Sequence, residues 1–230
     1  MYPIDTAYNQ ILSILNKDQR GKLKPSDFNI FAYQSINKLY AGLFTKFRLV
    51  VSRQNRFYNG QGLAKETHFV QQHLEHYLQT GEWTEIHDGK CKTAPDSNHV
   101  VEVVNPKGMF LEKVDSEYFN MITSHRYQNQ CNPYYRLEGN TLYVSPGIEK
   151  IKIQYLRKPK KPNWSYKVIQ GTPIFNPDAA DFCDLDIHPA LYSSLVEEIA
   201  FLSGVSIREP EVVQVMNQQK NTEIQKETLL

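Results

Sequence analysis

The stretch from Gly139 to Trp164 constrains the fold of this chain more than any other. Apolar and polar residues alternate on both sides of Ser145-Pro146-Gly147, a pattern that is typical of two strands joined by a turn. The alternating apolar positions are Leu142, Val144, Ile151, Ile153 and Tyr155. Pro159 and Pro162 follow, and proline favours an extended backbone because it fixes φ and lacks a ladder donor. The pattern therefore predicts a β-hairpin that runs into a stiff, basic arm suited to docking rather than to catalysis.

The composition narrows the class of protein. A chain of 230 residues forms one large domain or two small ones, and it is long enough to bury a core. It has 26 Lys and Arg against 25 Asp and Glu, so a net charge of +1 argues against a dedicated duplex nucleic-acid binder. A hydrophobic content of 40% is low for a globular chain, which favours a protein that completes its burial in an assembly.

The cysteines and the apolar segments predict a soluble protein made inside the cell. Cys91, Cys131 and Cys183 are widely spaced and form no C-x-x-C pair, which favours a reducing compartment over a disulfide framework. Residues 1–5 lack the basic and apolar regions of a signal peptide. No segment approaches the roughly 18 apolar residues of a membrane span.

The periodicities predict an α+β fold. Helices are expected over residues 4–15, 25–47, 63–78 and 189–204, with a last helix that opens at Pro210. We expect the N- and C-terminal helices to form a helical bundle with a central β-hairpin or small-sheet insertion and an extended proline-containing arm. The expected parts are an N-terminal helical part at 1–82, a β-rich insertion with the hairpin at 83–164, an extended connection at 165–187, and C-terminal helices at 188–230.

Two clusters could bind a metal, and for both a structural role is the favoured interpretation. The first has histidines and one cysteine at His68, His73, His76, His87, Cys91 and His99. It lacks a second closely spaced ligand pair, so surface and boundary histidines are expected. The second is Asp181, Asp184, Asp186 and His188. Such acids could hold the divalent metal of a nuclease, but acids beside a helix N-terminus also interact favourably with the helix dipole.

Two basic segments suggest contacts with other molecules. Arg48, Arg53 and Arg56 interleave with aromatic residues, as in proteins that hold single-stranded nucleic acid or line a DNA channel, although a solvated helix end is the favoured interpretation. The arm is expected to dock on a neighbouring protein subunit. Its residues are Arg157, Lys158, Pro159, Lys160, Lys161, Pro162 and Trp164.

Several stretches resemble structural proteins of crAss-like and related short-tailed bacteriophages. These stretches are Leu15–Gly21 followed by Pro25–Asn29, the hairpin with Tyr155–Trp164, and Asp186–Pro189 with Gly204–Pro210. They are similar to the head–tail connector, adaptor or ring proteins that lie below the portal. Residues 60–135 have no counterpart in this resemblance.

The resemblance implies a non-enzymatic virion protein at the head–tail interface, assembled in the host cytoplasm. It implies a homo-oligomeric ring of about twelve copies that binds the portal protein and other tail ring or tube proteins, extends the DNA channel and helps to retain packaged DNA. No cofactor, metal or membrane contact is expected. Arg48, Arg53 and Arg56 are candidates for lining this channel and for contacting its DNA non-specifically. The residues expected to dock on the portal are Arg208, Val212, Val213, Met216, Gln219 and Ile224.

Two other classes stay open at this stage. One is a metal-dependent DNA-processing enzyme that uses the acids at 181–188. The other is a monomeric module that binds single-stranded nucleic acid through residues 47–58.

Overall fold

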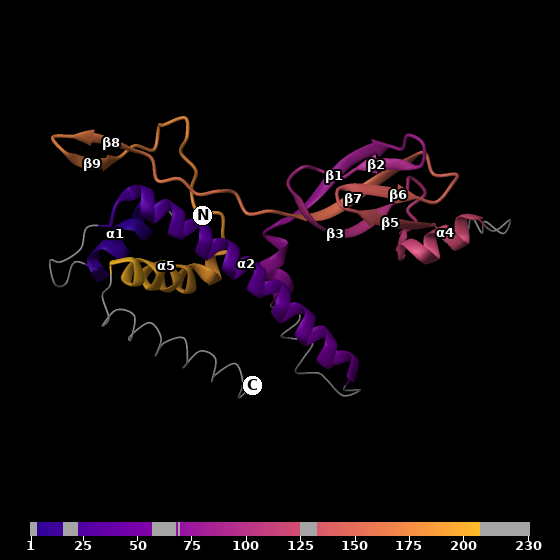
Figure 1. The fold of residues 1–230 in the computed structure, drawn as a ribbon, viewed down its shortest axis with the longest axis horizontal. Helices are drawn as coiled ribbons and strands as arrows, with labels where there is room; N and C mark the ends of the chain where they lie inside the picture. The colour runs from indigo at the N-terminus through magenta and orange to yellow at the C-terminus, as the bar shows by residue number, and fades with distance from the viewer. Residues whose placement is uncertain (1–3, 16–22, 57–67, 69, 125–132, 208–230) are drawn as a thin grey trace. The chain divides into compact units, whose positions relative to one another are not determined.

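The chain folds into two compact units. The structure is a computed structural model, and it describes residues 4–15, 23–56, 68, 70–124 and 133–207. The first unit combines residues from 1–76 and 159–230, and the second is built from residues 77–158. Along the sequence, the second unit is therefore inserted between two parts of the first. Figure 1 shows the elements of both units.

Most of the first unit is built by three helices. They are α1 (Ile4–Leu15), α2 (Pro25–Arg56) and α5 (Tyr192–Ile207). In α1, apolar residues recur every three or four positions, so Ile4 and Ile11 share one buried face. Proline suits the first position of α2 because its φ is already helical and its missing amide would have no helical partner there. The helix predicted over 4–15 is thus confirmed, and so is the start of the second helix at Pro25. The helix predicted over 189–204 exists as α5, but it continues through Gly204 to Ile207.

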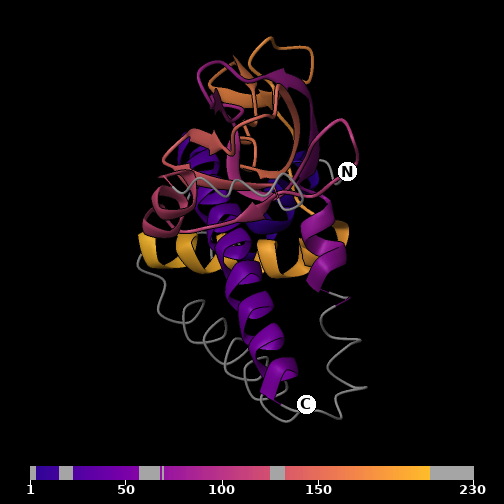
Figure 2. The ribbon, with the colours of Figure 1, turned by 90° about the vertical axis from the view of Figure 1, so that its right-hand side faces the viewer.

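Helices α2 and α5 pack across one another, as Figure 2 shows. On α2 the ammonium of Lys38 lies 2.6 Å from a carboxylate oxygen of Glu198 on α5. The Glu198 side chain is almost fully buried, so this ion pair provides charge compensation for a carboxylate that burial would otherwise penalise. The contact fixes the position of α5 along α2.

Helices alone do not close the core of the first unit. Trp164, Leu185 and Ile187 come from irregular segments, and they are buried together with helical residues such as Phe28 and Ile199. The same part of the chain contains a short 3-10 helix, η2 (Pro189–Leu191), and the hairpin of β8 (Tyr166–Ile169) and β9 (Thr172–Phe175). The unit is therefore a mixed structure in which the long segment from residue 159 to η2 supplies part of the core.

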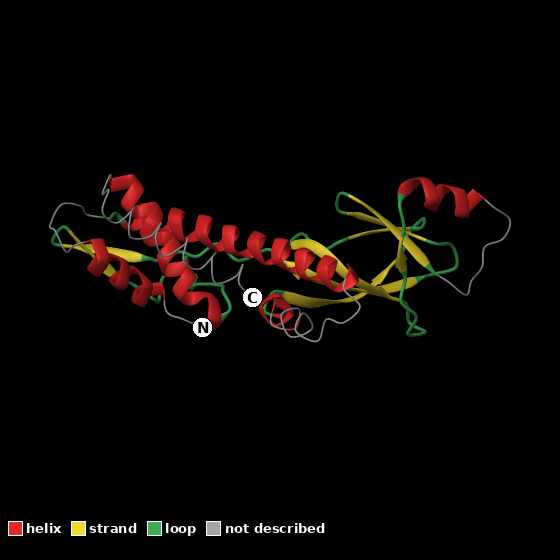
Figure 3. Ribbon diagram, turned by 90° about the horizontal axis from the view of Figure 1, so that it is seen from below, coloured by secondary structure: helices red, strands yellow, loops and turns green. Residues whose placement is uncertain are grey.

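Two sheets and a helix form the second unit (Figure 3). The three-stranded sheet has the order β1 (Leu78–Glu85), β7 (Lys150–Arg157), β3 (Ser97–Val104). The four-stranded sheet has the order β2 (Lys90–Lys92), β6 (Thr141–Val144), β5 (Tyr134–Glu138), β4 (Glu112–Lys113). Helix α4 spans Ser116–Ser124. Alternation along β6 and β7 sends Leu142, Ile151 and Ile153 into one shared core.

The predicted helical bundle with a small β insertion is wrong. The described residues form nine strands in three sheets, and one of these sheets lies in the unit that was expected to be helical. The physical reason is that the helices of the first unit leave part of their apolar surface uncovered, and Trp164 and its neighbours cover it from an extended backbone. Periodicity shows which face of an element is apolar, but it does not show which element covers that face.

The hairpin expected around Ser145-Pro146-Gly147 is also wrong, although both of its strands exist. β6 pairs with β2 and β5, whereas β7 pairs with β1 and β3. The turn carries the chain from one sheet to the other, and Gly147 has the positive φ of +86° that such a turn needs. Alternation of apolar residues fixes which side of a strand is buried, but several partners can satisfy the same alternation.

Two further expectations need correction. The helix predicted over 63–78 is helical at 70–75, but Leu78 opens strand β1 and Gly81 lies inside that strand rather than at a helix end. The expected extended connection at 165–187 contains hairpin β8–β9. Among the described residues, no helix combines the length and apolar character that crossing a membrane requires.

Candidate interaction surface

Trp164 supports hairpin β8–β9 of the first unit. Its indole Nε1 donates a hydrogen bond to Asp5 Oδ1 at 2.9 Å, and its backbone amide donates to Asn29 Oδ1 at 2.8 Å. Only 3% of the residue is exposed. Trp164, which we expected to contact a neighbouring subunit, is therefore held inside its own unit.

The residues on either side of Trp164 are fixed by a second set of hydrogen bonds. Asn163 Nδ2 donates to the carbonyl oxygen of Asp181 at 2.8 Å, and Ser165 Oγ donates to Asp181 Oδ1 at 2.9 Å. The backbones of Asn163 and Cys183 also bond to each other in both directions. Because these partners lie on both sides of the hairpin in sequence, they hold its two ends together.

The base of hairpin β8–β9 stacks on the Trp164 indole. Tyr166 and Phe175 face each other across the two strands, and each ring centroid lies 5.7 Å from that of Trp164. On its other side the indole packs on Tyr8 at 4.4 Å. Stacked and tilted aromatic contacts of this kind add to the stabilisation from buried area. Aromatic contacts therefore hold the base of the hairpin on its unit.

Beyond its base the hairpin is apolar and exposed. Val168 is 64% exposed, Ile169 54% and Ile174 48%. Successive side chains on a strand point to opposite faces, so Val168 lies on the face of Tyr166, whereas Ile169 and Ile174 lie on the other face. In Figure 1 the hairpin forms an outer edge of its unit. Exposed aliphatic side chains on both faces of one hairpin are the feature that sequence analysis missed.

The sequence did contain a signal for this hairpin. Gln170 and Gly171 both have positive φ, 52° and 81°, which is the backbone of a two-residue turn of the type that favours hairpins. Glycine at the second turn position and a β-branched residue before the turn are consistent with such a hairpin. Pro173 and the prolines that precede the strands pointed instead to an extended connection.

The basic arm before Trp164 lies along its own chain. The Arg157 guanidinium lies over the Tyr77 ring at 5.5 Å, and the Lys158 amide donates to the Asp96 carbonyl oxygen at 2.8 Å. Pro159 and Pro162 are buried, whereas Lys158, Lys160 and Lys161 are exposed. The three lysine side chains are thus the most exposed part of the arm.

The acids at 181–188 serve separate structural roles. Asp184 Oδ1 accepts hydrogen bonds from the amides of Ile4 and Leu185 at 2.7 and 2.8 Å. His188 caps η2, because its Nδ1 accepts from the Ala190 amide at 3.2 Å. Asp181 fixes the base of the hairpin, as described above. These acceptors are directed to different donors and do not converge on one point.

Asp186 is 1% exposed and lies beside three histidines. One of its carboxylate oxygens accepts from the Lys160 amide at 2.8 Å, and the other lies 3.1 Å from His76 Nε2. The His73 and His188 rings lie 4.7 Å apart. Burial, followed by His188 and Lys46, lowers the pKa of His73. Burial, followed by His76, lowers the pKa of His188.

The residues considered as metal ligands are divided between the two units. His68, His73 and His76 belong to the first unit, and His87, Cys91 and His99 to the second. Within the described parts of the chain, no group of three or more His, Cys, Asp or Glu side chains has the arrangement of a metal site. Burial raises the pKa of the Cys91 thiol. Cys91 is therefore a buried core residue of the four-stranded sheet.

Two sets of predicted contact residues cannot be placed. Arg48, Arg53 and Arg56 lie on α2, but the described structure does not include their side chains. The residues expected to dock on the portal lie outside the described residues. They are Arg208, Val212, Val213, Met216, Gln219 and Ile224.

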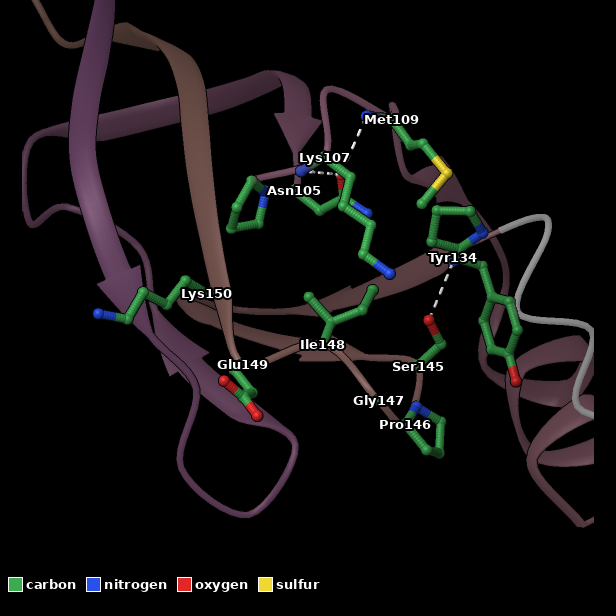
Figure 4. Close-up of a pocket in the computed structure, with 12 residues that line it drawn as sticks. Asn105, Lys107, Met109, Tyr134, Ser145, Pro146, Gly147, Ile148, Glu149 and Lys150 are labelled. Atoms are coloured by element: carbon green, nitrogen blue, oxygen red, sulfur yellow. Dashed lines mark hydrogen bonds between the residues drawn. The ribbon is translucent and has the colours of Figure 1, made fainter.

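The second unit contains a pocket of about 400 Å³ between the β3–β4 turn and the β6–β7 turn. Figure 4 shows Lys107 and Met109 from the first turn, and Ser145 and Ile148 from the second. The Asn105 side chain accepts from the amides of Lys107 and Met109 at 3.0 and 2.9 Å. The Ser145 hydroxyl accepts from the Tyr134 amide at 3.3 Å. These two side chains therefore bond within the chain. Proline side chains, Met109 and Ile148 form the apolar part of the lining.

Comparisons with known proteins do not assign a class to this fold. A scan against models of known protein families gave no match, and a search of curated protein sequences gave none either.

Proposed function

We propose that this protein is a structural component of a tailed-phage virion that forms a homomeric ring between portal and tail. The single observation that supports this proposal most is the anchored hairpin with Val168, Ile169 and Ile174 exposed. The resemblance of the terminal stretches to head–tail connector and ring proteins supports the particular place in the virion. In this role the protein extends the DNA channel and bridges the portal to the next tail ring.

The energetics of the hairpin favour an assembly function. An isolated two-stranded hairpin is marginally stable in water, and here Tyr166 and Phe175 at its base pack on Trp164 of its own unit. Burying apolar surface contributes about 25 cal/mol for each Å², so covering three aliphatic side chains stabilises an assembly substantially. A ring subunit can use such a surface, because burying it against a neighbouring copy stabilises the contact.

The direct test of the proposal uses the portal protein of the same phage. The purified chain is mixed with the portal, and the complex is weighed by native mass spectrometry. We expect a stoichiometric complex in which the copy number of this chain matches the symmetry of a ring. A chain that stays monomeric and leaves the portal mass unchanged over a wide concentration range would rule the proposal out.

A double variant tests whether the hairpin is the surface through which the complex forms. Val168→Asp with Ile169→Asp places charges on the exposed hairpin and should abolish the complex while leaving the monomer folded. Ile30→Asp provides the control, because Ile30 is 51% exposed on α2 and distant from the hairpin in sequence.

A further inference from the structure

We infer that the hairpin of one copy inserts Ile169 into the pocket of the second unit of a neighbouring copy. This inference rests on the proposed ring and identifies the two surfaces that would join its subunits. The hairpin surface is formed by Lys167, Val168, Ile169 and Ile174. The receiving surface is the pocket between Asn105–Met109 and Ser145–Lys150.

The shape of the hairpin favours insertion over lying flat on a surface. Exposed aliphatic side chains occur on both of its faces, so contact with one flat surface would leave one face in water. The pocket lies between two turns, so each turn can contact one face of an inserted hairpin tip. The anchored base reduces the conformational entropy that docking would otherwise cost.

The chemistry of the pocket matches an aliphatic side chain. Its apolar lining comes from Pro106, Met109, Pro133, Pro146 and Ile148. Asn105 Oδ1 and Ser145 Oγ already accept hydrogen bonds from backbone amides, so these two acceptors are satisfied without a ligand. A volume of about 400 Å³ accommodates a branched aliphatic side chain together with part of the hairpin turn.

One pair of charges beside the two surfaces is complementary, Lys167 on the hairpin and Glu149 on the pocket, whose lining also carries Lys107 and Lys150. Lys167 and Ile169 lie on the same face, two residues apart, so their Cα atoms are about 7 Å apart along the strand. Glu149 lies on the rim of the pocket and is exposed. Figure 4 shows Glu149 and Lys107 on opposite sides of Ile148, so an approach from the Glu149 side brings unlike charges together. Lys150 on the same rim already pairs with Glu85 at 3.0 Å.

A second copy of this chain is the occupant that fits a ring. In a ring that closes by rotation, one surface of each subunit contacts a different surface of the next subunit. The hairpin belongs to the first unit and the pocket to the second, so every copy carries both surfaces.

Photo-crosslinking tests this inference directly. Ile169 is replaced by the photoreactive residue p-benzoylphenylalanine, and heavy-isotope-labelled chain carrying the replacement is mixed with unlabelled wild-type chain, alone and with the portal. Mass spectrometry of mixed-isotope peptides then identifies links between copies. We expect links to residues 105–109 or 145–150 of the other copy, and no such links when the probe replaces Ile30.

Charge-reversal variants provide a second, independent test of the contact. Lys167→Glu alone and Glu149→Lys alone should each lower the yield of links between copies several-fold, and the double variant should restore it. Links that fall only elsewhere, or single-variant losses that the double variant does not repair, would overturn the inference. If assemblies still form in that case, the proposed ring stands without this contact. A chain that is monomeric with and without the portal would remove both.

Discussion

Trp164 shows how one side chain can determine a surface. The sequence places it at the end of a basic arm, and its partners Asp5 and Asn29 lie 159 and 135 residues away. No local pattern indicates contacts at such a distance. The arm was therefore predicted as a strut that projects outward, whereas its tryptophan is buried and supports the hairpin that follows.

Replacing Trp164 should test this role. Trp164→Ala should lower the free energy of unfolding of the first unit by about 3–5 kcal/mol, because it removes a buried ring and leaves Asp5 Oδ1 without the indole donor. The measurement is urea unfolding followed by the helical circular dichroism signal, since α1, α2 and α5 all belong to this unit.

Tyr33 provides the control for that measurement, because it lies on α2 in the same unit and is 37% exposed. Tyr33→Ala should lower the free energy of unfolding by about 1 kcal/mol or less. Equal losses for the two variants would contradict the assigned role of Trp164.

The histidines around Asp186 predict a pH dependence of stability. The pKa values of His73 and His188 are lowered in the folded chain, so between those values and about 6.5 the unfolded chain binds more protons. The stability that these residues contribute is present above about pH 6.5 and is lost as the pH falls through the folded values. Urea midpoints of the first unit should therefore decrease below that pH.

The comparison variant is His73→Gln, which removes one of the two titrating groups and the Lys46 repulsion that acts on it. This variant should show a shallower decrease in midpoint with falling pH than the wild type. An unchanged slope would show that the dependence arises elsewhere in the chain.

At the scale of elements, hairpin β8–β9 depends on its turn. Gln170 and Gly171 both have positive φ, which asparagine tolerates better than glutamine and glycine better than alanine. Gln170→Asn should raise the hydrogen-exchange protection of the hairpin amides, and Gly171→Ala should lower it. The global unfolding free energy should change little in either case, because the tip packs on nothing within the described part of its unit. Opposite shifts would show that the turn is assigned incorrectly.

The elements also show how far sequence reasoning reaches. Helical spacing located α1, the start of α2 and α5, and alternation located β6 and β7. Alternation could not show that β6 and β7 pair with different neighbours, because pairing depends on contacts distant in sequence. The exposed hairpin was missed because its prolines indicated a connection. The pocket joins two turns nearly forty residues apart and has no local signature.

For the whole molecule, the insertion of one unit into the other predicts independent folding. The ends of the second unit pair with each other, since Leu78 lies opposite Leu156 and the Arg157 amide donates to the Tyr77 carbonyl oxygen at 2.9 Å. Its core is formed by its own sheets. A fragment of residues 77–158 should therefore unfold cooperatively and show a β-type circular dichroism spectrum. A fragment without a cooperative transition would contradict this division into units.

The central claim is that this chain assembles through its hairpin. The most direct test is mass photometry of wild-type chain and of the Val168→Asp, Ile169→Asp variant, each alone and with the portal protein. The account predicts ring-sized particles or a stoichiometric portal complex for the wild type, and folded monomers for the variant. Wild-type chain that remains monomeric in both mixtures, or a variant that assembles as the wild type does, would contradict it.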